Sequence, residues 1–208
     1  MRTLLLFAAF LSGPGAWAQS PVAQPTDYVV SNRAFTVDGA TGIAHMNEAP
    51  GDGIAWIKDQ VFSEGTIEVD IRGKDAFQQS FVGIAYHGVD DSSFEAVYFR
   101  PFNFRSADTA RVLHAVQYVA PPVYDWSKLR QEHPNKYEKP VSPAPDPNDW
   151  FHVRIVVGAD KVTVFVNGST AASLQVTPIV HRAGGKLGYW VGNGSAGDWK
   201  NLRITAKK

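Results

Sequence analysis

Residues 95–105, EAVYFRPFNFR, place aromatic rings beside groups that could bind a polar ligand. In a β-strand, successive side chains point to opposite faces. Tyr98 and Arg100 would then share one face, with Val97 and Phe99 on the other. Because Val97 and Phe99 are apolar, we expect their face to pack in a core. The strand therefore predicts that Tyr98 and Arg100 lie on the floor of an open surface.

Pro101 cannot donate a backbone hydrogen bond, so strand pairing should end there and turn Asn103 and Arg105 toward the rim of the same surface. A ring, an amide and guanidinium groups together match the apolar face and the hydroxyl or acidic groups of a saccharide. The alternative is a polar network that fastens a loop to the sheet. Four further residues could complete the saccharide site: Gln117, Trp126, Arg130 and Trp190.

The sequence indicates groups for proton transfer less clearly than it indicates groups for ligand binding. Glu95 begins the same strand; structural pairing with an arginine is the favoured interpretation, and a general acid or base is the alternative. His87 ends a strand on which Gly83 and Ala85 share its side, which leaves space above the sheet. We take Glu95 and His87 as the catalytic candidates. The six histidines show no zinc-ligand spacing.

The surrounding chain has the two-residue periodicity of strands. In residues 66–72, TIEVDIR, apolar side chains alternate with charged ones, so one face is dry and the other wet. Gly and Asx turns separate such segments, and no amphipathic helical pattern of useful length occurs. We predict an all-β sandwich of two antiparallel sheets, with further strands at 80–87, 94–100, 111–119, 150–157, 161–168, 186–192 and 199–206.

Residues 119–149 interrupt this rhythm with prolines, Tyr124, Trp126 and Tyr137. Long loops of this kind are uncommon in compact domains and are usually functional when they are ordered. We predict a stiffened flap across one face of the sandwich, against the alternative of a decorative insertion.

The N-terminus has a basic residue, an apolar run and an Ala-Trp-Ala site, which predicts a signal peptide over residues 1–18. We expect export to the periplasm or the extracellular space, a flexible tail at 19–27 and one domain at 28–208. The apolar run is too short to span a membrane. The chain has no cysteine and no formal net charge, so neither disulfides nor nucleic-acid binding is indicated.

The C-terminal segments resemble a known superfamily. A Trp-opened strand at 150–157, a hairpin ending in Val166-Asn167-Gly168 and the run GYWVGNGSAGDWKNL are similar to concanavalin A-like lectins and glucanases, including laminin-G-like domains. The resemblance covers residues 35–204 and implies a jelly roll with one concave sheet open to ligand. A weaker resemblance is to bacterial 3-keto-disaccharide hydrolase domains, although their metal-binding residues do not form a recognisable run here.

The resemblance also suggests two sites to test. Retaining glucanases of the superfamily carry Glu-x-Asp-x-Glu on one strand; Glu68 and Asp70 match it, but Arg72 occupies the third position. Members that hold calcium use an aspartate near the last strand, where this chain has Asp198; a turn-stabilising role is the alternative.

Three functions remain open from the sequence. The first is carbohydrate binding in a cleft that the flap covers. The second is a glycoside hydrolase or lyase acting on a polysaccharide or disaccharide. The third is a laminin-G-like protein-interaction module.

Overall fold

The computed structural model describes residues 24–207. The predicted signal peptide at 1–18 and residues 19–23 of the predicted tail lie outside the described residues. The described end of the tail forms one 3-10 turn, η1 (Pro25–Asp27). None of the helices in the described part is long and apolar enough to cross a bilayer.

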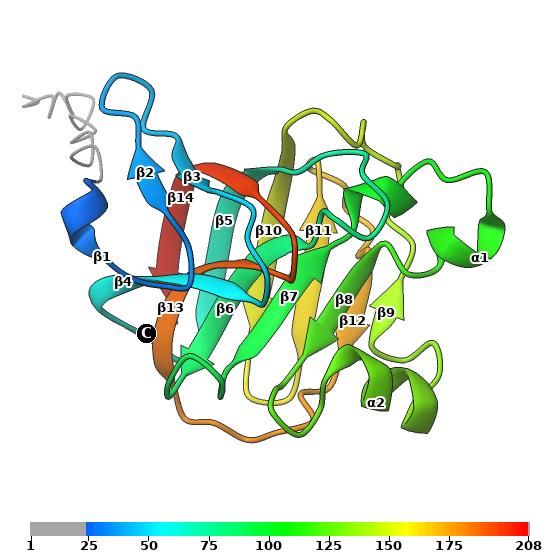
Figure 1. Cartoon of the computed structure of the whole chain (residues 1–208). Coiled ribbons are helices and arrows are strands. Elements are labelled where there is room, and N and C mark those ends of the chain that lie inside the picture. Colours follow the sequence, from blue (N-terminus) through cyan, green and yellow to red (C-terminus); the bar gives the residue numbers. More distant parts are fainter. Residues whose placement is uncertain (1–23, 208) are drawn as a thin grey trace, which may run out of the picture.

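Two antiparallel sheets of seven strands pack face to face (Figure 1), which confirms the predicted all-β sandwich. Sheet A has the order β1 (Tyr28–Ser31), β4 (Gly53–Phe62), β13 (Gly185–Val191), β6 (Val82–Gly88), β7 (Glu95–Phe99), β8 (Val116–Val119) and β9 (Glu138–Lys139). Sheet B has the order β12 (Leu174–Val176), β11 (Val162–Val166), β10 (Phe151–Val157), β5 (Gly65–Arg72), β14 (Gly197–Ala206), β3 (Ala44–Met46) and β2 (Phe35–Val37).

One face of sheet B is buried and the other faces solvent, as the alternation predicts. Ile67, Val69 and Ile71 of β5 are fully buried against sheet A, whereas Glu68 and Asp70 point outward and remain partly exposed. Burial of such aliphatic side chains is the main force that holds the two sheets together.

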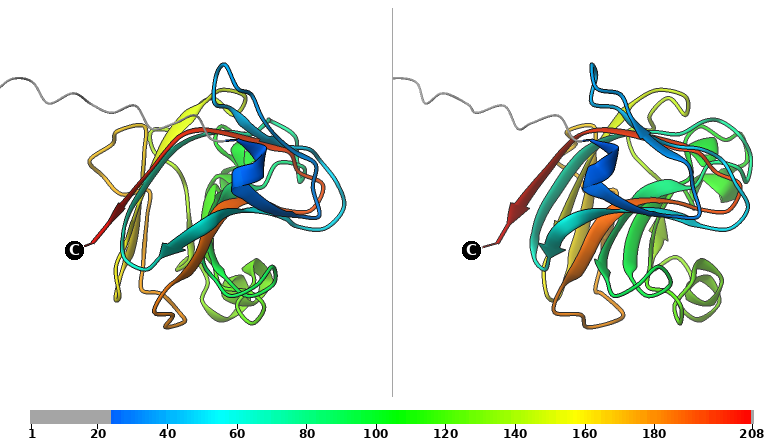
Figure 2. Two further views of the ribbon diagram at one scale, coloured as in Figure 1. Left: turned by 90° about the vertical axis from the view of Figure 1, so that its left-hand side faces the viewer. Right: turned by 60° about the vertical axis from the view of Figure 1, so that its left-hand side comes forward.

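Sheet A differs, because β6, β7 and β8 are buried on both faces. Their inner face meets sheet B; for example, the ring of Phe99 lies 5.1 Å from that of Phe151. Their outer face is covered by connecting segments that carry η2 (Pro101–Asn103), α1 (Thr109–Val112) and α2 (Trp126–Glu132). Figure 2 shows α2 on the side of sheet A that faces away from sheet B. The candidate site lies between this cover and the sheet.

Two expectations about local structure are wrong. The strand expected at 111–119 begins only at Val116, because residues 109–112 form α1, whose first turn is capped by Asp108. The segment 119–149 is a cover over sheet A, but it is not without secondary structure: it contains α2 and β9. The alternation-based search also misses the long strand β4, whose first four residues are buried without alternation.

Candidate functional site

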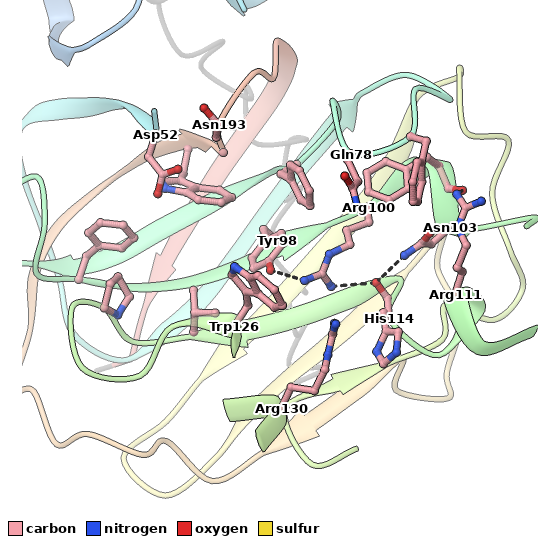
Figure 3. Close-up of a pocket in the computed structure, with 18 residues that line it drawn as sticks. Asp52, Gln78, Tyr98, Arg100, Asn103, Arg111, His114, Trp126, Arg130 and Asn193 are labelled. Carbon is pink, nitrogen blue, oxygen red and sulfur yellow. Dashed lines mark hydrogen bonds between the residues drawn. The ribbon is translucent and has the colours of Figure 1, made fainter. Parts of the chain in front are cut away.

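A pocket of about 580 Å³ opens on the outer face of sheet A (Figure 3). Its floor is formed by β7 and β13, and its walls by η2, α1, α2 and the loops at 73–81 and 192–196. Seven Phe, Tyr and Trp side chains line it: Phe77, Phe81, Phe94, Tyr98, Phe102, Trp126 and Trp190. Polar groups stand between these rings, so the pocket combines an apolar lining with hydrogen-bonding groups.

Tyr98 and Arg100 lie at the centre of the floor, and a buried network fixes both. The Tyr98 hydroxyl donates to Gln117 Oε1 at 2.9 Å and accepts from Arg100 Nη2. Arg100 Nη2 also donates to Gln117 Oε1, while Nη1 donates to the His114 carbonyl at 2.9 Å. Burial raises the pKa of Tyr98 to about 12, although the charge of Arg100 acts in the opposite direction. Tyr98 is therefore a protonated donor at neutral pH.

The α2 side of the pocket is fastened to sheet A by an ion pair. Arg130 donates Nε to Glu138 Oε1 at 2.8 Å and Nη2 to Glu138 Oε2 at 2.7 Å. Burial opposes ionisation of Glu138, but the hydrogen bonds and charge of Arg130 outweigh it and lower the pKa of Glu138. The guanidinium of Arg130 also lies 5.1 Å from the ring centre of Trp126, which is half exposed at the pocket mouth.

The η2–α1 side contributes Asn103 and Arg111. Arg111 donates to Asn103 Oδ1 at 3.2 Å and to the Phe102 carbonyl at 2.9 Å, and its guanidinium lies 4.2 Å from the ring centre of Phe77. Asn103 Nδ2 in turn donates to the His114 carbonyl at 3.2 Å. These contacts hold an arginine head group at the pocket wall while leaving its other donors open.

His114 stands between the two arginine-bearing sides. Its Nδ1 lies 2.8 Å from Glu138 Oε2, although the angle is not that of a hydrogen bond. Burial lowers the pKa of His114, and the charges of Arg130 and Arg100 add to this effect against the pull of Glu138. A lowered pKa keeps His114 neutral at physiological pH.

Asp52 and Asn193 lie at the opposite end of the pocket from Arg111 (Figure 3). Asp52 is an exposed residue at the rim. Desolvation of its carboxyl group nevertheless raises its pKa, and the charge of Arg33 and the backbone N–H of Asn193 offset only part of this. The rim therefore carries a carboxylate that holds a proton more readily than an ordinary aspartate.

Trp190 supplies the one clear unsatisfied donor of the floor. Its ring lies 5.0 Å from that of Tyr98 and is 6% exposed, yet its Nε1 finds no hydrogen-bond partner among residues 24–207. A buried donor without a partner costs free energy, which an acceptor on a ligand would relieve if binding uncovers the atom.

The pocket brings together six of the eight ligand-binding residues expected from the sequence. They are Tyr98, Arg100, Asn103, Trp126, Arg130 and Trp190. Gln117 pairs with Tyr98 across β7 and β8 and lies on the same face, but it is fully buried and acts on the pocket only through Tyr98 and Arg100. Arg105 lies outside, beside a separate cavity of about 220 Å³, and pairs with Asp146 at 3.2 Å.

The two proton-transfer candidates lie away from this pocket. Glu95 points between the sheets, where its carboxylate accepts from the Tyr118 hydroxyl and lies 2.8 Å from His87 Nδ1. His87 was expected on the open side, but its φ of +51° breaks the strand alternation and turns its ring toward Glu95. Both side chains are buried, and neither lines the pocket.

Asp198 lies on the outer face of sheet B and does not fit a calcium site. Its Oδ1 lies 2.7 Å from His45 Nδ1 and its Oδ2 lies 2.9 Å from Arg72 Nη2. Both oxygens thus face basic side chains. No group of three or more His, Cys, Asp or Glu side chains suited to a metal ion occurs between residues 24 and 207.

Sequence reasoning missed Asp52, Arg111, His114 and Asn193. Arg111 and His114 fall in the segment that was assigned to a strand, and Asp108 was the available signal for a helix there, since its side chain accepts from the Ala110 N–H. Asp52 and Asn193 lie in Gly-rich loops, where no local pattern indicates which side chains face a pocket.

The family model of the 3-keto-alpha-glucoside-1,2-lyase-like domain matches residues 14–205, nearly the whole chain. The chain belongs to this family. No curated protein matches the chain.

Solved structures agree on the fold. A carbohydrate-binding module from Bacillus subtilis superposes with a TM-score of 0.59 at 12% identity, over 85% of this chain and 93% of that one. A putative glycosyl hydrolase from Parabacteroides distasonis gives 0.57 at 12% identity, over 89% and 90%. The β-glucanase of Bacillus licheniformis gives 0.52 at 13% identity, over 83% and 82%. These similarities confirm the concanavalin A-like jelly roll and, at such identity, the fold alone.

Proposed function

We propose that this protein binds a saccharide in the pocket on the outer face of sheet A. The observation that carries the proposal is the meeting of Tyr98, Arg100, Trp126 and Trp190 in one cavity of about 580 Å³. Pockets for small ligands typically enclose about 300–1,000 Å³, with an apolar lining and a few convergent polar groups.

The rings and the polar groups have separate roles in this proposal. Trp126, half exposed at the mouth, offers a flat face to the apolar side of a sugar ring. Arg100 offers donors to sugar oxygens from the floor, and Trp190 Nε1 would add one if binding uncovers it. Membership of a family named for a glucoside lyase supports the same class of ligand. With the signal peptide predicted at 1–18, this binding would take place outside the cytoplasm.

Isothermal titration calorimetry against glucosides, disaccharides and short oligosaccharides tests the proposal. Trp126→Ala should weaken binding of any sugar that the wild type binds by about tenfold, since stacking of an aromatic side chain contributes about 0.5–1.5 kcal/mol beyond area burial. Phe165→Ala, on the outer face of sheet B beside Arg154, is the matched control and should leave binding unchanged. Absence of binding across the panel would refute the proposal.

A second candidate is catalysis of the reaction in the family name, elimination from a 3-keto-α-glucoside. A ketone acidifies the proton on the neighbouring carbon. A base removes that proton, the adjacent anomeric carbon loses its glycosidic oxygen, a carbon–carbon double bond forms, and the departing oxygen takes up a proton from solvent. Asp52 is the carboxylate residue that lines the pocket, and its raised pKa suits a general base. Arg100 would stabilise negative charge on the ketone oxygen.

Release of methanol from methyl 3-keto-α-glucoside, followed together with the ultraviolet absorbance of the unsaturated ketone, tests this second function. Asp52→Asn should lower turnover by about 100-fold or more, the usual contribution of a general base. Asp160→Asn, at an exposed turn of sheet B, is the control. Sugar binding without methanol release would remove the lyase proposal and leave the binding proposal in place.

A further inference from the structure

The pocket has an uneven charge distribution, and this bears on which saccharide it takes if the proposed function holds. Three guanidinium groups, those of Arg100, Arg111 and Arg130, line the pocket on one side, together with His114. The carboxylate of Asp52 lies at the other end (Figure 3). On the arginine side, Glu138 is the carboxylate that pairs with Arg130 and His114, and more distantly with Arg100.

The charge of Glu138 is largely taken up by Arg130. Two aligned hydrogen bonds of 2.8 and 2.7 Å join Arg130 and Glu138 in the two-point geometry that arginine and carboxylate prefer. Arg100 Nη1 is 3.8 Å from the same carboxylate, beyond hydrogen-bond distance. One negative charge therefore stands against three positive ones.

Arg100 is the member of this group whose burial costs the most free energy. It is 5% exposed, and its hydrogen bonds go to neutral acceptors: the His114 carbonyl, the Tyr98 hydroxyl and the Gln117 amide oxygen. Neutral acceptors satisfy the N–H groups but do not balance the charge. A buried charge without a closely paired countercharge is unfavourable, so an anion in the pocket would offset the cost.

Arg111 is the second arginine available to such an anion, because it lines the same pocket. Its two hydrogen bonds go to the Asn103 side chain and the Phe102 carbonyl, and it forms no ion pair with a carboxylate in the described part of the chain. The ring of Phe77, 4.2 Å away, fixes the plane of the guanidinium. Arginine held in this way suits planar, two-point recognition of a carboxylate.

We propose that the saccharide carries an anionic substituent, a carboxylate or a sulfate ester, and that Arg100 and Arg111 bind it at the η2–α1 side of the pocket. The neutral part of the sugar then extends over Trp190 toward Trp126. Asp52 disfavours a second anionic group at the far end, so the preferred ligand has one charged end.

Calorimetry with three matched probes tests the inference: methyl α-glucuronide, methyl α-glucoside and a sulfate ester of the same glucoside. The glucuronide or the sulfate ester should bind wild type about tenfold or more tightly than the neutral glucoside, because charge-assisted hydrogen bonds are roughly twice as strong as neutral ones. Whichever of the two binds more tightly identifies the anionic group. The preference should also shrink as salt is raised from about 0.05 to 0.5 M.

Arg111→Gln keeps a hydrogen-bonding side chain but removes the charge. It should reduce the anionic preference, the ratio of affinities for the charged and the neutral probe on the same variant, to near unity. Arg111→Lys should retain part of the preference, and Arg154→Gln, on the outer face of sheet B, all of it. The far-ultraviolet circular dichroism of each variant checks its fold.

Equal binding of the three probes to wild type would overturn this inference and leave the proposed function standing. A preference that survives in Arg111→Gln and in Arg100→Gln would also overturn it. Failure of all saccharides, charged and neutral, would instead refute the proposed function on which it rests.

Discussion

Arg130 donates two hydrogen bonds to Glu138, Nε to Oε1 at 2.8 Å and Nη2 to Oε2 at 2.7 Å. Because Arg130 is in α2 and Glu138 is in β9, this pair ties the helix to the edge of sheet A. Trp126 begins α2, so the pair also holds the tryptophan at the pocket mouth. The cover and the pocket are thus connected through one carboxylate.

Glu138→Gln should lower the free energy of unfolding by about 2 kcal/mol. Removing one partner of a fully buried pair costs about 3–5 kcal/mol, and the partial exposure of the Arg130 side chain reduces this. Urea unfolding measures the change. Glu132→Gln, whose exposed carboxylate lies 3.9 Å from Lys128, is the control and should shift stability by less than about 0.5 kcal/mol. Equal effects of the two variants would contradict this account of α2.

Glu138 should also make the fold sensitive to acid. Its pKa is lower in the folded chain than the usual glutamate value of about 4.3. The folded state therefore binds fewer protons there, and the stabilisation is present above about pH 4.3 and lost as pH falls through the lowered pKa. Urea midpoints between about pH 6 and pH 3 should fall more steeply for the wild type than for Glu138→Gln. Parallel slopes would show that Glu138 is not the group responsible.

The pair of His87 and Glu95 predicts the opposite pH dependence. Burial lowers the pKa of His87, but the hydrogen bonds to Glu95 and to the Ser63 carbonyl, with the charge of Glu95, outweigh it and leave the pKa raised. The stabilisation is therefore complete below about pH 6.5 and lost as pH rises through the raised pKa. Wild type should lose urea resistance between about pH 6 and pH 9, and His87→Gln should lose little. Exposed His181→Gln is the control; if it changed the profile as much as His87→Gln, the pair would not be the cause.

Strand periodicity was sufficient to place Tyr98 and Arg100 on the outer face of sheet A, although both side chains are buried under the cover and not open to solvent. The alternation of side chains is a property of the extended backbone, so it could be read from residues 94–100 alone. It failed at His87, where a left-handed φ reverses the direction of the side chain. A positive φ at a non-glycine residue leaves no mark in the hydrophobic pattern.

The enclosure of the pocket could not be predicted in the same way. It depends on how the segments at 73–81, 101–115 and 120–149 pack over sheet A, and these are contacts between residues far apart in the chain. Arg111 shows the local part of the difficulty: apolar spacing around it favours a strand, whereas the cap formed by Asp108 starts a short helix. The cap starts the short helix that carries Arg111. That helix therefore places the positive charge of Arg111 on its side of the pocket.

Trp190→Phe should weaken saccharide binding by about fivefold and lower stability less than the same change at Trp199. The substitution keeps an aromatic ring beside Tyr98 but removes Nε1, a covered donor that has no partner in the described chain and that a sugar oxygen would satisfy if binding uncovers it. One hydrogen bond contributes about 0.5–1.5 kcal/mol, which corresponds to this loss. Calorimetry and urea unfolding of the same preparation measure both quantities.

Trp199→Phe is the matched control for this prediction. Trp199 Nε1 donates to the Gly83 carbonyl at 3.2 Å in the core, so its loss should destabilise the fold by about 1 kcal/mol or more and leave the affinity of the folded protein unchanged. The two tryptophans thus predict opposite results, binding lost in one and stability lost in the other. If Trp190→Phe behaved like Trp199→Phe, its indole N–H would serve the fold, and the floor of the pocket would have no donor reserved for a sugar.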